Sequence, residues 1–204
     1  MNNQSPFLIV LTGKTASGKD TVMAKLMNTL PNLKKVVTTT SRKPRSNEKN
    51  GVDYYFISEA EFRQKINQED FIEYVSYGGN LYGTEKKQIT DNLDKNLIWR
   101  IDPSRAGQIK EFMEDSDFKL TQNLLKRTAV IYLTTSDEVV LERLKRRGLT
   151  KQEIETRMGE DQRFWKQFKD NYNFVVENTP GKLNETVAKI IQIIYFLAKD
   201  CNLK

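Results

Sequence analysis

The sequence predicts an α/β fold in which helices flank a parallel sheet, and three observations support this class. Apolar runs typical of buried strands stand at 7–12, 97–101 and 129–133, with a weaker run at 174–176. Segments with helical spacing of apolar residues separate these runs, and such alternation is typical of a parallel sheet. The chain has 204 residues, enough for one domain with a sizeable core.

The first strand and the first helix are predicted on either side of a glycine-bearing loop. The run FLIVLT at 7–12 lies between a proline and a glycine and has the character of a fully buried strand. Val22, Leu26 and Leu30 then repeat at four-residue spacing. This spacing predicts a helix over 20–30, which the following proline closes.

Capping boxes mark the beginnings of three further helices. The pattern Ser/Thr-x-x-Glu begins at Ser58, Thr135 and Thr150, where the hydroxyl and the glutamate satisfy the first free amides of a helix. The last helix, 182 to about 200, carries its leucine, valine and isoleucine side chains on one face. That stripe predicts packing against the core.

Two segments depart from the alternation of strands and helices. Residues 38–88 are rich in Thr, Arg, Tyr and Gly with short strand-like pieces, which predicts an inserted, mostly β subdomain. Residues 143–165 are charged, helical and poor in apolar residues, as in a mobile lid. We therefore expect a single domain over 1–204, with a core formed by 1–37, 89–142 and 166–204.

Composition limits the chemistry and the compartment. The 33 basic and 27 acidic residues leave a net charge of +6, which suits an anionic partner without identifying it. Histidine is absent and Cys201 is the only cysteine, which excludes histidine catalysis, a zinc site and a disulfide framework, and predicts a cytoplasmic protein. The N-terminus lacks a signal peptide, and IIQIIYFLA is too short to span a membrane, so no membrane partner is expected.

The loop after the first strand has the pattern of a phosphate-binding loop. The stretch GKTASGKDT at 13–21 matches G-x-x-x-x-G-K-[ST] up to its last position. Its glycines let successive N–H groups point inward, the next helix adds its positive N-terminal end, and Lys19 can reach the β- and γ-phosphates. The residues predicted to bind ATP are Gly13, Lys14, Thr15, Ala16, Ser17, Gly18, Lys19, Asp20 and Thr21.

Asp20 is the departure from that pattern. The position normally carries a hydroxyl that binds Mg²⁺, and a carboxylate can also serve a hard cation directly or through water. We therefore expect Mg²⁺ as the cofactor, with ATP as co-substrate and Asp20 as its ligand.

Three blocks carry a family resemblance: TSRKPRSNEKNGVDYYF at 40–56, FIEYVSYGGNLYGT at 71–84, and RLKRRG followed by IETR at 143–157. In their order and over nearly the whole chain they resemble the signature blocks of guanylate kinases. The resemblance implies a P-loop NTPase-type fold and transfer of the γ-phosphate of ATP to GMP, giving ADP and GDP.

The side chains in these blocks fit a nucleoside monophosphate. Arg42 and Arg45 flank a proline and offer paired guanidinium forks to a phosphate dianion, and Glu73 can accept two donors from the edge of guanine. The resemblance implies that the GMP phosphate is bound by Arg42, Arg45, Tyr54 and Tyr82, and that the base is bound by Thr38, Glu73 and Thr84. Asp102 matches the second acid of a D-x-D pair, in which Arg100 replaces the first acid. The segment VVENT resembles the adenine side, where Asn178 is a candidate.

The predicted catalytic residues are Lys19 of the loop and the lid arginines Arg143, Arg147 and Arg157. Arginines that close over a transferring phosphoryl group stabilise its charge. The acceptor is itself an anionic phosphate oxygen, so the lack of histidine is no obstacle.

Other functions stay open from the sequence alone. One is a kinase for a different acceptor, such as ribose 1,5-bisphosphate or dGMP. Another is a non-catalytic guanylate-kinase-like module that binds phosphopeptides. The net charge alone would also suit nucleic acid. We expect ATP and GMP as partners, no nucleic acid, and a monomer or homodimer.

Overall fold

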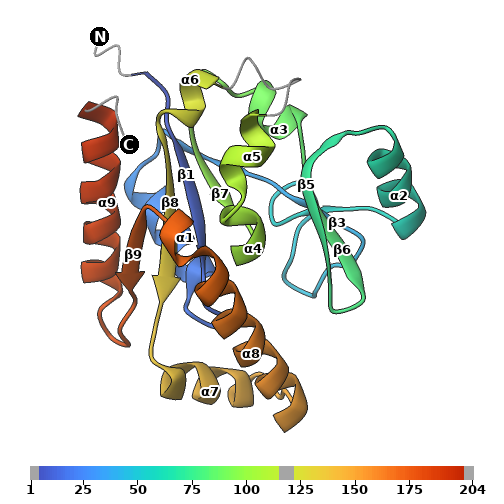
Figure 1. Ribbon diagram of the computed structural model, residues 1–204, viewed down its shortest axis with the longest axis vertical. Coiled ribbons are helices and arrows are strands. Elements are labelled where there is room, and N and C mark those ends of the chain that lie inside the picture. The colour runs from blue at the N-terminus through green and yellow to red at the C-terminus, as the bar shows by residue number, and fades with distance from the viewer. Residues whose placement is uncertain (1–4, 115–121, 200–204) are drawn as a thin grey trace.

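A computed structural model describes residues 5–114 and 122–199 of this chain (Figure 1). The prediction for Cys201 and the end of the last helix expected near residue 200 lie outside these ranges.

The predicted parallel sheet is confirmed. Its order is β2-β7-β1-β8-β9, and each neighbouring pair is parallel. β2 was not predicted, because its sequence LKKV carries two lysines and has no apolar run. The strands are β1 (Leu8–Gly13), β2 (Leu33–Val36), β7 (Asn96–Arg100), β8 (Thr128–Thr134) and β9 (Phe174–Glu177).

Both faces of this sheet are buried, and alternation along β1 divides its side chains between them. Ile9 and Leu11 pack with the apolar faces of α1 (Lys19–Thr29) and α9 (Leu183–Lys199). Leu8 and Val10 face the opposite core, which includes residues of α4 (Pro103–Ala106), α5 (Ile109–Glu114) and α6 (Gln122–Leu125). A strand covered on both sides needs an uninterrupted apolar run, which explains FLIVL.

The insertion forms a second sheet beside the first, between β2 and β7 in the chain (Figure 1). Its order is β4-β3-β6-β5, and Phe62 of α2 stacks on Phe71 with ring centroids 4.4 Å apart. Its elements, with the short helix that leads back to the main sheet, are β3 (Thr39–Thr40), β4 (Tyr55–Phe56), α2 (Glu59–Asn67), β5 (Phe71–Tyr77), β6 (Asn80–Glu85) and α3 (Lys87–Thr90).

The charged segment forms the end of α7 (Asp137–Arg146) and most of α8 (Lys151–Phe168), which extend together beyond the end of the central sheet (Figure 1). The capping boxes at Ser58 and Thr150 are confirmed. The one predicted at Thr135 is wrong, because the neighbouring Ser136 is the cap and accepts from the Val139 amide. A 3₁₀ turn at Lys169–Asn171 then leads to β9.

A small apolar cluster joins these two helices to the phosphate loop. Ala16 of the loop is buried with Val140, Leu144 and Ile154. Within the described ranges, no helix is both long enough and apolar enough for a membrane span.

Candidate active site

A cavity of about 800 Å³ lies where the phosphate loop, the second sheet and α8 face one another. The loop follows the carboxyl end of β1, and residues 100–103 lie at the carboxyl end of β7. The chain order of the strands reverses around β1, which is where open parallel sheets bind ligands.

The phosphate loop is held in a conformation that requires glycine. Gly13 has φ of +138°, and a Cβ there would lie 2.1 Å from the carbonyl oxygen of Leu133. Gly18 has φ of +93° at the start of α1, whose free amides form an anion site.

Lys19 folds back over this loop. Its ammonium donates to the carbonyl oxygens of Gly13 and Lys14 at 2.7 and 2.8 Å. Burial, and then the positive charge of Arg100, lower the pKa of Lys19 to about 8. A bound phosphate would favour the charged form of this ammonium.

Residues of α7 and of the turn before it contact the same loop from outside the cavity. Lys14 pairs with Asp137 and donates to the carbonyl oxygen of Thr135 at 3.2 Å. Arg143 donates to the carbonyl oxygen of Ala16 at 2.7 Å. Neither Lys14 nor Arg143 belongs to the cavity lining among the described residues.

Asp161 and Asn178 make further contacts with the loop. The Thr15 amide donates to the Asp161 carboxylate at 2.8 Å, and burial raises the pKa of Asp161 to about 6. The Asn178 amide donates to the Ser17 carbonyl at 2.8 Å, and its oxygen accepts from Thr186 at 3.0 Å. Asn178 therefore holds the loop in place through its hydrogen bond to the Ser17 carbonyl.

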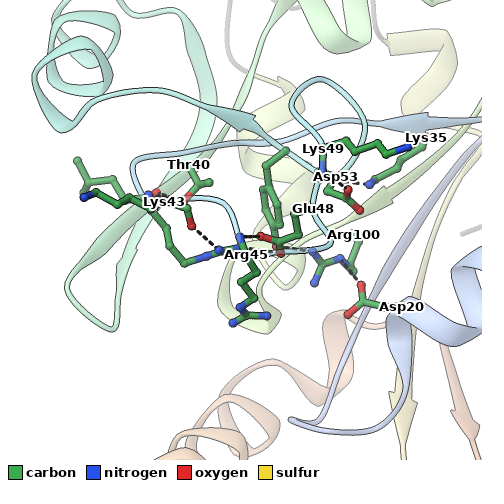
Figure 2. Close-up of polar contacts among 12 residues, drawn as sticks. Asp20, Lys35, Thr40, Lys43, Arg45, Glu48, Lys49, Asp53 and Arg100 are labelled. Carbon is green, nitrogen blue, oxygen red and sulfur yellow. Dashed lines mark hydrogen bonds and ion pairs between the residues drawn. The ribbon is translucent and has the colours of Figure 1, made fainter.

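Across the cavity, the predicted arginine pair is organised by Glu48 (Figure 2). The guanidinium of Arg42 donates to Glu48 at 2.8 Å, and the Arg45 amide donates to the other carboxylate oxygen at 2.8 Å. The Arg42 hydrogen bond is the main cause that holds the pKa of Glu48 below its usual range. The guanidinium of Arg45 has no hydrogen bond or ion pair with the part of the chain that the structure describes.

Two tyrosines adjoin this pair. Arg42 lies 5.5 Å from the ring centroid of Tyr54, and the rings of Tyr54 and Tyr82 meet edge to face at 6.1 Å. The cluster presents guanidinium and phenol donors to one place, as a phosphate dianion requires.

A buried carboxylate lies in the cavity wall at Glu73, which is 5 % exposed. It accepts from the Thr84 hydroxyl at 2.7 Å, and that hydroxyl accepts from the indole N–H of Trp99 at 2.9 Å. Burial raises the pKa of Glu73 to about 7, against the smaller lowering effect of the Thr84 bond. Thr38 also lines the cavity, whereas Thr84 does not.

Arg100 connects the two halves of the site (Figure 2). Its Nε lies 3.1 Å from an oxygen of Asp20, and its terminal nitrogen donates to the Tyr54 hydroxyl. Asp102 lines the cavity and caps α4, accepting from the Ser104 amide at 2.9 Å. The two residues that break the expected motifs, Asp20 and Arg100, are thus bonded to each other.

Arg147 at the end of α7 and Arg157 of α8 also line the cavity. Arg157 lies 5.2 Å from the ring centroid of Tyr77 on β5, so that α8 reaches the second sheet at this point. α8 therefore forms one side of the cavity.

Comparisons with known proteins identify the family of this chain. The family model described as guanylate kinase matches residues 5–196. The chain belongs to the guanylate kinase family. A guanylate kinase of Clostridium tetani is 34 % identical over 92 % of this chain and 84 % of its own length. One of Clostridium perfringens strain SM101 is 32 % identical, over 98 % and 86 %.

A solved structure supports the fold. The crystal structure of guanylate kinase from Anaplasma phagocytophilum superposes with a TM-score of 0.69, covering 98 % of this chain and 90 % of its own. At 24 % identity this similarity supports the fold class alone.

Most residues predicted for a guanylate kinase site line the cavity. Their positions suit the predicted roles, and the roles themselves stay predictions. Four differ. Lys14, Arg143 and Asn178 hold the loop from outside the cavity, and Thr84 orients Glu73, so their expected contacts with ligand are not favoured by the geometry.

Four contributors to the site were not predicted from the sequence. Lys35 lines the cavity from the unpredicted β2, Tyr77 contacts Arg157 of α8, Asp161 holds a loop amide, and Glu48 holds the arginine pair. Glu48 carried a signal, because it stands three positions after Arg45 within the quoted block, where a turn brings its carboxylate back to the Arg45 amide. Asp161 carried none, since it is one charge among many on α8.

Proposed function

We propose that this chain transfers the γ-phosphate of ATP to GMP, giving ADP and GDP. The observation that carries the proposal is that two separate anion-binding groups face one cavity. One is the phosphate loop with Lys19, and the other is the pair Arg42 and Arg45 in the loop between β3 and β4. The curated relatives named guanylate kinase support the same reaction.

The donor end of the cavity suits the phosphates of ATP. The loop residues 13–21 supply amides and the positive end of α1, and Lys19 supplies an ammonium at the β- and γ-phosphates. We assign Lys14 and Arg143 to holding this loop in place, since Lys14 pairs with Asp137 at the start of α7 and Arg143 donates to the loop backbone.

The acceptor end suits GMP. In this proposal Arg42, Arg45, Tyr54 and Tyr82 bind the phosphate dianion. Glu73 accepts the N1–H and N2–H₂ donors of guanine, with Thr84 fixing the carboxylate and Thr38 and Asp102 beside it in the wall of the cavity.

Transfer then depends on stabilising charge that develops between the two nucleotides. Arg147 and Arg157 line the cavity on the lid side, where their guanidinium groups can neutralise the oxygens of the moving phosphoryl group. The attacking oxygen belongs to a phosphate and is already ionised, so no residue needs to remove a proton. We propose residues 38–88 as the acceptor subdomain and 143–165 as the lid that excludes water.

A magnesium ion is also part of the proposal. Asp20 offers a largely exposed carboxylate beside the loop, and within residues 5–114 and 122–199 no three acidic, histidine or cysteine side chains gather into a metal group. That donor set fits an ion that is held by one carboxylate, water and the phosphates it accompanies. Such an ion would neutralise the β- and γ-phosphates.

The reducing compartment suggested by the single cysteine supports a cytoplasmic setting.

A coupled assay of ADP release tests the assignment. Saturating ATP is combined with GMP, dGMP, AMP or ribose 1,5-bisphosphate as acceptor. Turnover is expected with GMP at a kcat/KM at least about tenfold above that for AMP, because only guanine offers paired donors to Glu73. Ribose 1,5-bisphosphate as the preferred acceptor, or no turnover with any acceptor despite GMP binding, would contradict the proposal.

A further inference from the structure

The guanidinium of Arg100 lies inside the acceptor cluster and belongs to the wall of the cavity. It bonds to the hydroxyl of Tyr54, and its central carbon lies 5.5 Å from the centroid of the same ring. Arg42 lies at the same distance from that centroid. Two guanidinium groups therefore contact one tyrosine. Arg100 thus adds a third guanidinium group beside those of Arg42 and Arg45.

The partner of Arg100 in the free protein is easily displaced. The Asp20 side chain is 76 % exposed, whereas the Arg100 side chain is 23 % exposed. An ion pair with one partner in water contributes little, because water solvates that partner equally well without the pair. A phosphate that accepts two parallel N–H bonds from a guanidinium forms the stronger contact.

Lys35, which also lines this side of the cavity, is differently placed. The Lys35 ammonium donates to the carbonyl oxygens of Val52 and Asp53 at 2.6 and 3.1 Å (Figure 2). Two of its three N–H donors are thus bonded to a loop of the second sheet's subdomain. Arg100, in contrast, has its Nε on a carboxylate that a ligand can replace.

We propose that Arg100 is a phosphate-binding residue of the acceptor site, which Asp20 holds in the free protein and releases to the phosphate of the bound acceptor. This inference rests on the proposed function, because it assumes that the Arg42–Arg45 cluster binds the acceptor's phosphate. The exchange also frees the Asp20 carboxylate on the donor side. Arg100 therefore links filling of the acceptor site to the state of the phosphate loop.

The test is calorimetry of GMP and of guanosine in the absence of ATP and metal, with guanosine measured by displacement. The variants are Arg100→Gln, Arg100→Lys, Asp20→Asn and, as a matched loss of one charge, Lys34→Gln. Lys34 is exposed on β2 and donates to Asn92. It does not line the cavity.

We expect Arg100→Gln to weaken GMP by about 10- to 100-fold and to leave guanosine within twofold. Arg100→Lys is expected to restore part of the loss, Lys34→Gln to have less than a twofold effect, and Asp20→Asn to strengthen GMP. GMP affinity of Arg100→Gln within twofold of the wild-type value would overturn the inference. An equal loss for GMP and guanosine would also overturn it, because it indicates a structural role.

Failure of the two proposals can be told apart. If the wild-type protein binds no GMP, the proposed function fails and the role of Arg100 fails with it. If the wild-type protein binds GMP and Arg100→Gln binds it equally well, only the role of Arg100 is refuted.

Discussion

Replacing Glu73 by glutamine should remove a pH dependence from GMP binding. The Glu73 carboxylate is buried, accepts from Thr84 at 2.7 Å, and has its pKa raised by burial to about 7. Only the ionised form can accept two guanine donors, so binding below pH 7 must first release a proton. With that pKa, the affinity of the wild-type protein should fall about tenfold between pH 8 and pH 6, which is about 1.4 kcal/mol.

The variant separates this effect from titration of GMP itself. The phosphate of GMP has a second pKa of about 6, which affects both proteins alike. At pH 8 the Glu73→Gln variant should bind GMP about 10- to 100-fold more weakly, since its amide leaves a guanine donor unpaired. At pH 6 that difference should shrink about tenfold.

Calorimetric titrations of both proteins at pH 6, 7 and 8 make the measurement. The reasoning is refuted if the affinity ratio between wild type and variant is the same at all three values. Such a result would mean that Glu73 either stays ionised throughout or does not meet the base.

The same carboxyl affects stability. Its folded-state pKa of about 7 lies above the usual 4.5, so the folded state binds the proton more tightly. Stability contributed by the protonated group is therefore present below pH 4.5 and is lost as pH rises to about 7. Above that pH the ionised group costs about 3 kcal/mol. Chemical unfolding should show Glu73→Gln to be more stable than wild type at pH 8, with the gain vanishing near pH 4; a gain of the same size at both values would contradict this account.

Three further predictions concern the phosphate loop and the lid. Lys19→Met should lower kcat by about 10³-fold or more, because the ammonium faces the developing charge, while calorimetry shows GMP binding unchanged; unaltered turnover would remove the loop from the mechanism. Arg157→Ala should lower kcat by about 10³-fold, whereas Arg163→Ala on the same helix should not, and equal rates for the two would exclude the lid arginine. Gly13→Ala should lower Tm by roughly 10 °C because its Cβ would meet the Leu133 carbonyl, whereas Gly159→Ala, whose Cβ meets nothing within 4 Å, should not lower it.

The parts of the fold predicted from sequence are those that burial on two faces imposes. β1, β7 and β8 need uninterrupted apolar runs because helices cover both sides of the sheet. β2 has two lysines in four residues and lies at the edge of the sheet, so no such run marks it. β3 and β4 are two residues long, which is too short for any periodic pattern.

Local sequence signals also did not distinguish between two neighbouring residues as the cap of α7. Thr135 and Ser136 both carry hydroxyls before α7, and the Thr135 spacing to Glu138 resembles a capping box. In the fold, residue 135 is buried directly after β8, and the exposed Ser136 becomes the cap. Burial at the end of the strand decided between two equivalent residues.

The candidate site, like the fold, could be predicted from the sequence only in part. Residue types and spacing were enough to assemble the loop, the arginine pair and Glu73 into one cavity. The bonds that Arg143 and Asp161 make to the loop, and the pairing of Arg100 with Asp20, join distant segments. Such contacts depend on how the sheet and helices are stacked, which no local spacing encodes.

The central claim is that two nucleotides meet end to end in one cavity, and a joined ligand tests it most directly. Guanosine and adenosine linked through five phosphates should bind one per chain, at least about 100-fold tighter than GMP or ADP alone, because joining the two parts removes the cost of the second association. It should also exclude both GMP and ADP. Binding no tighter than ADP, or displacement of only one nucleotide, would contradict the account.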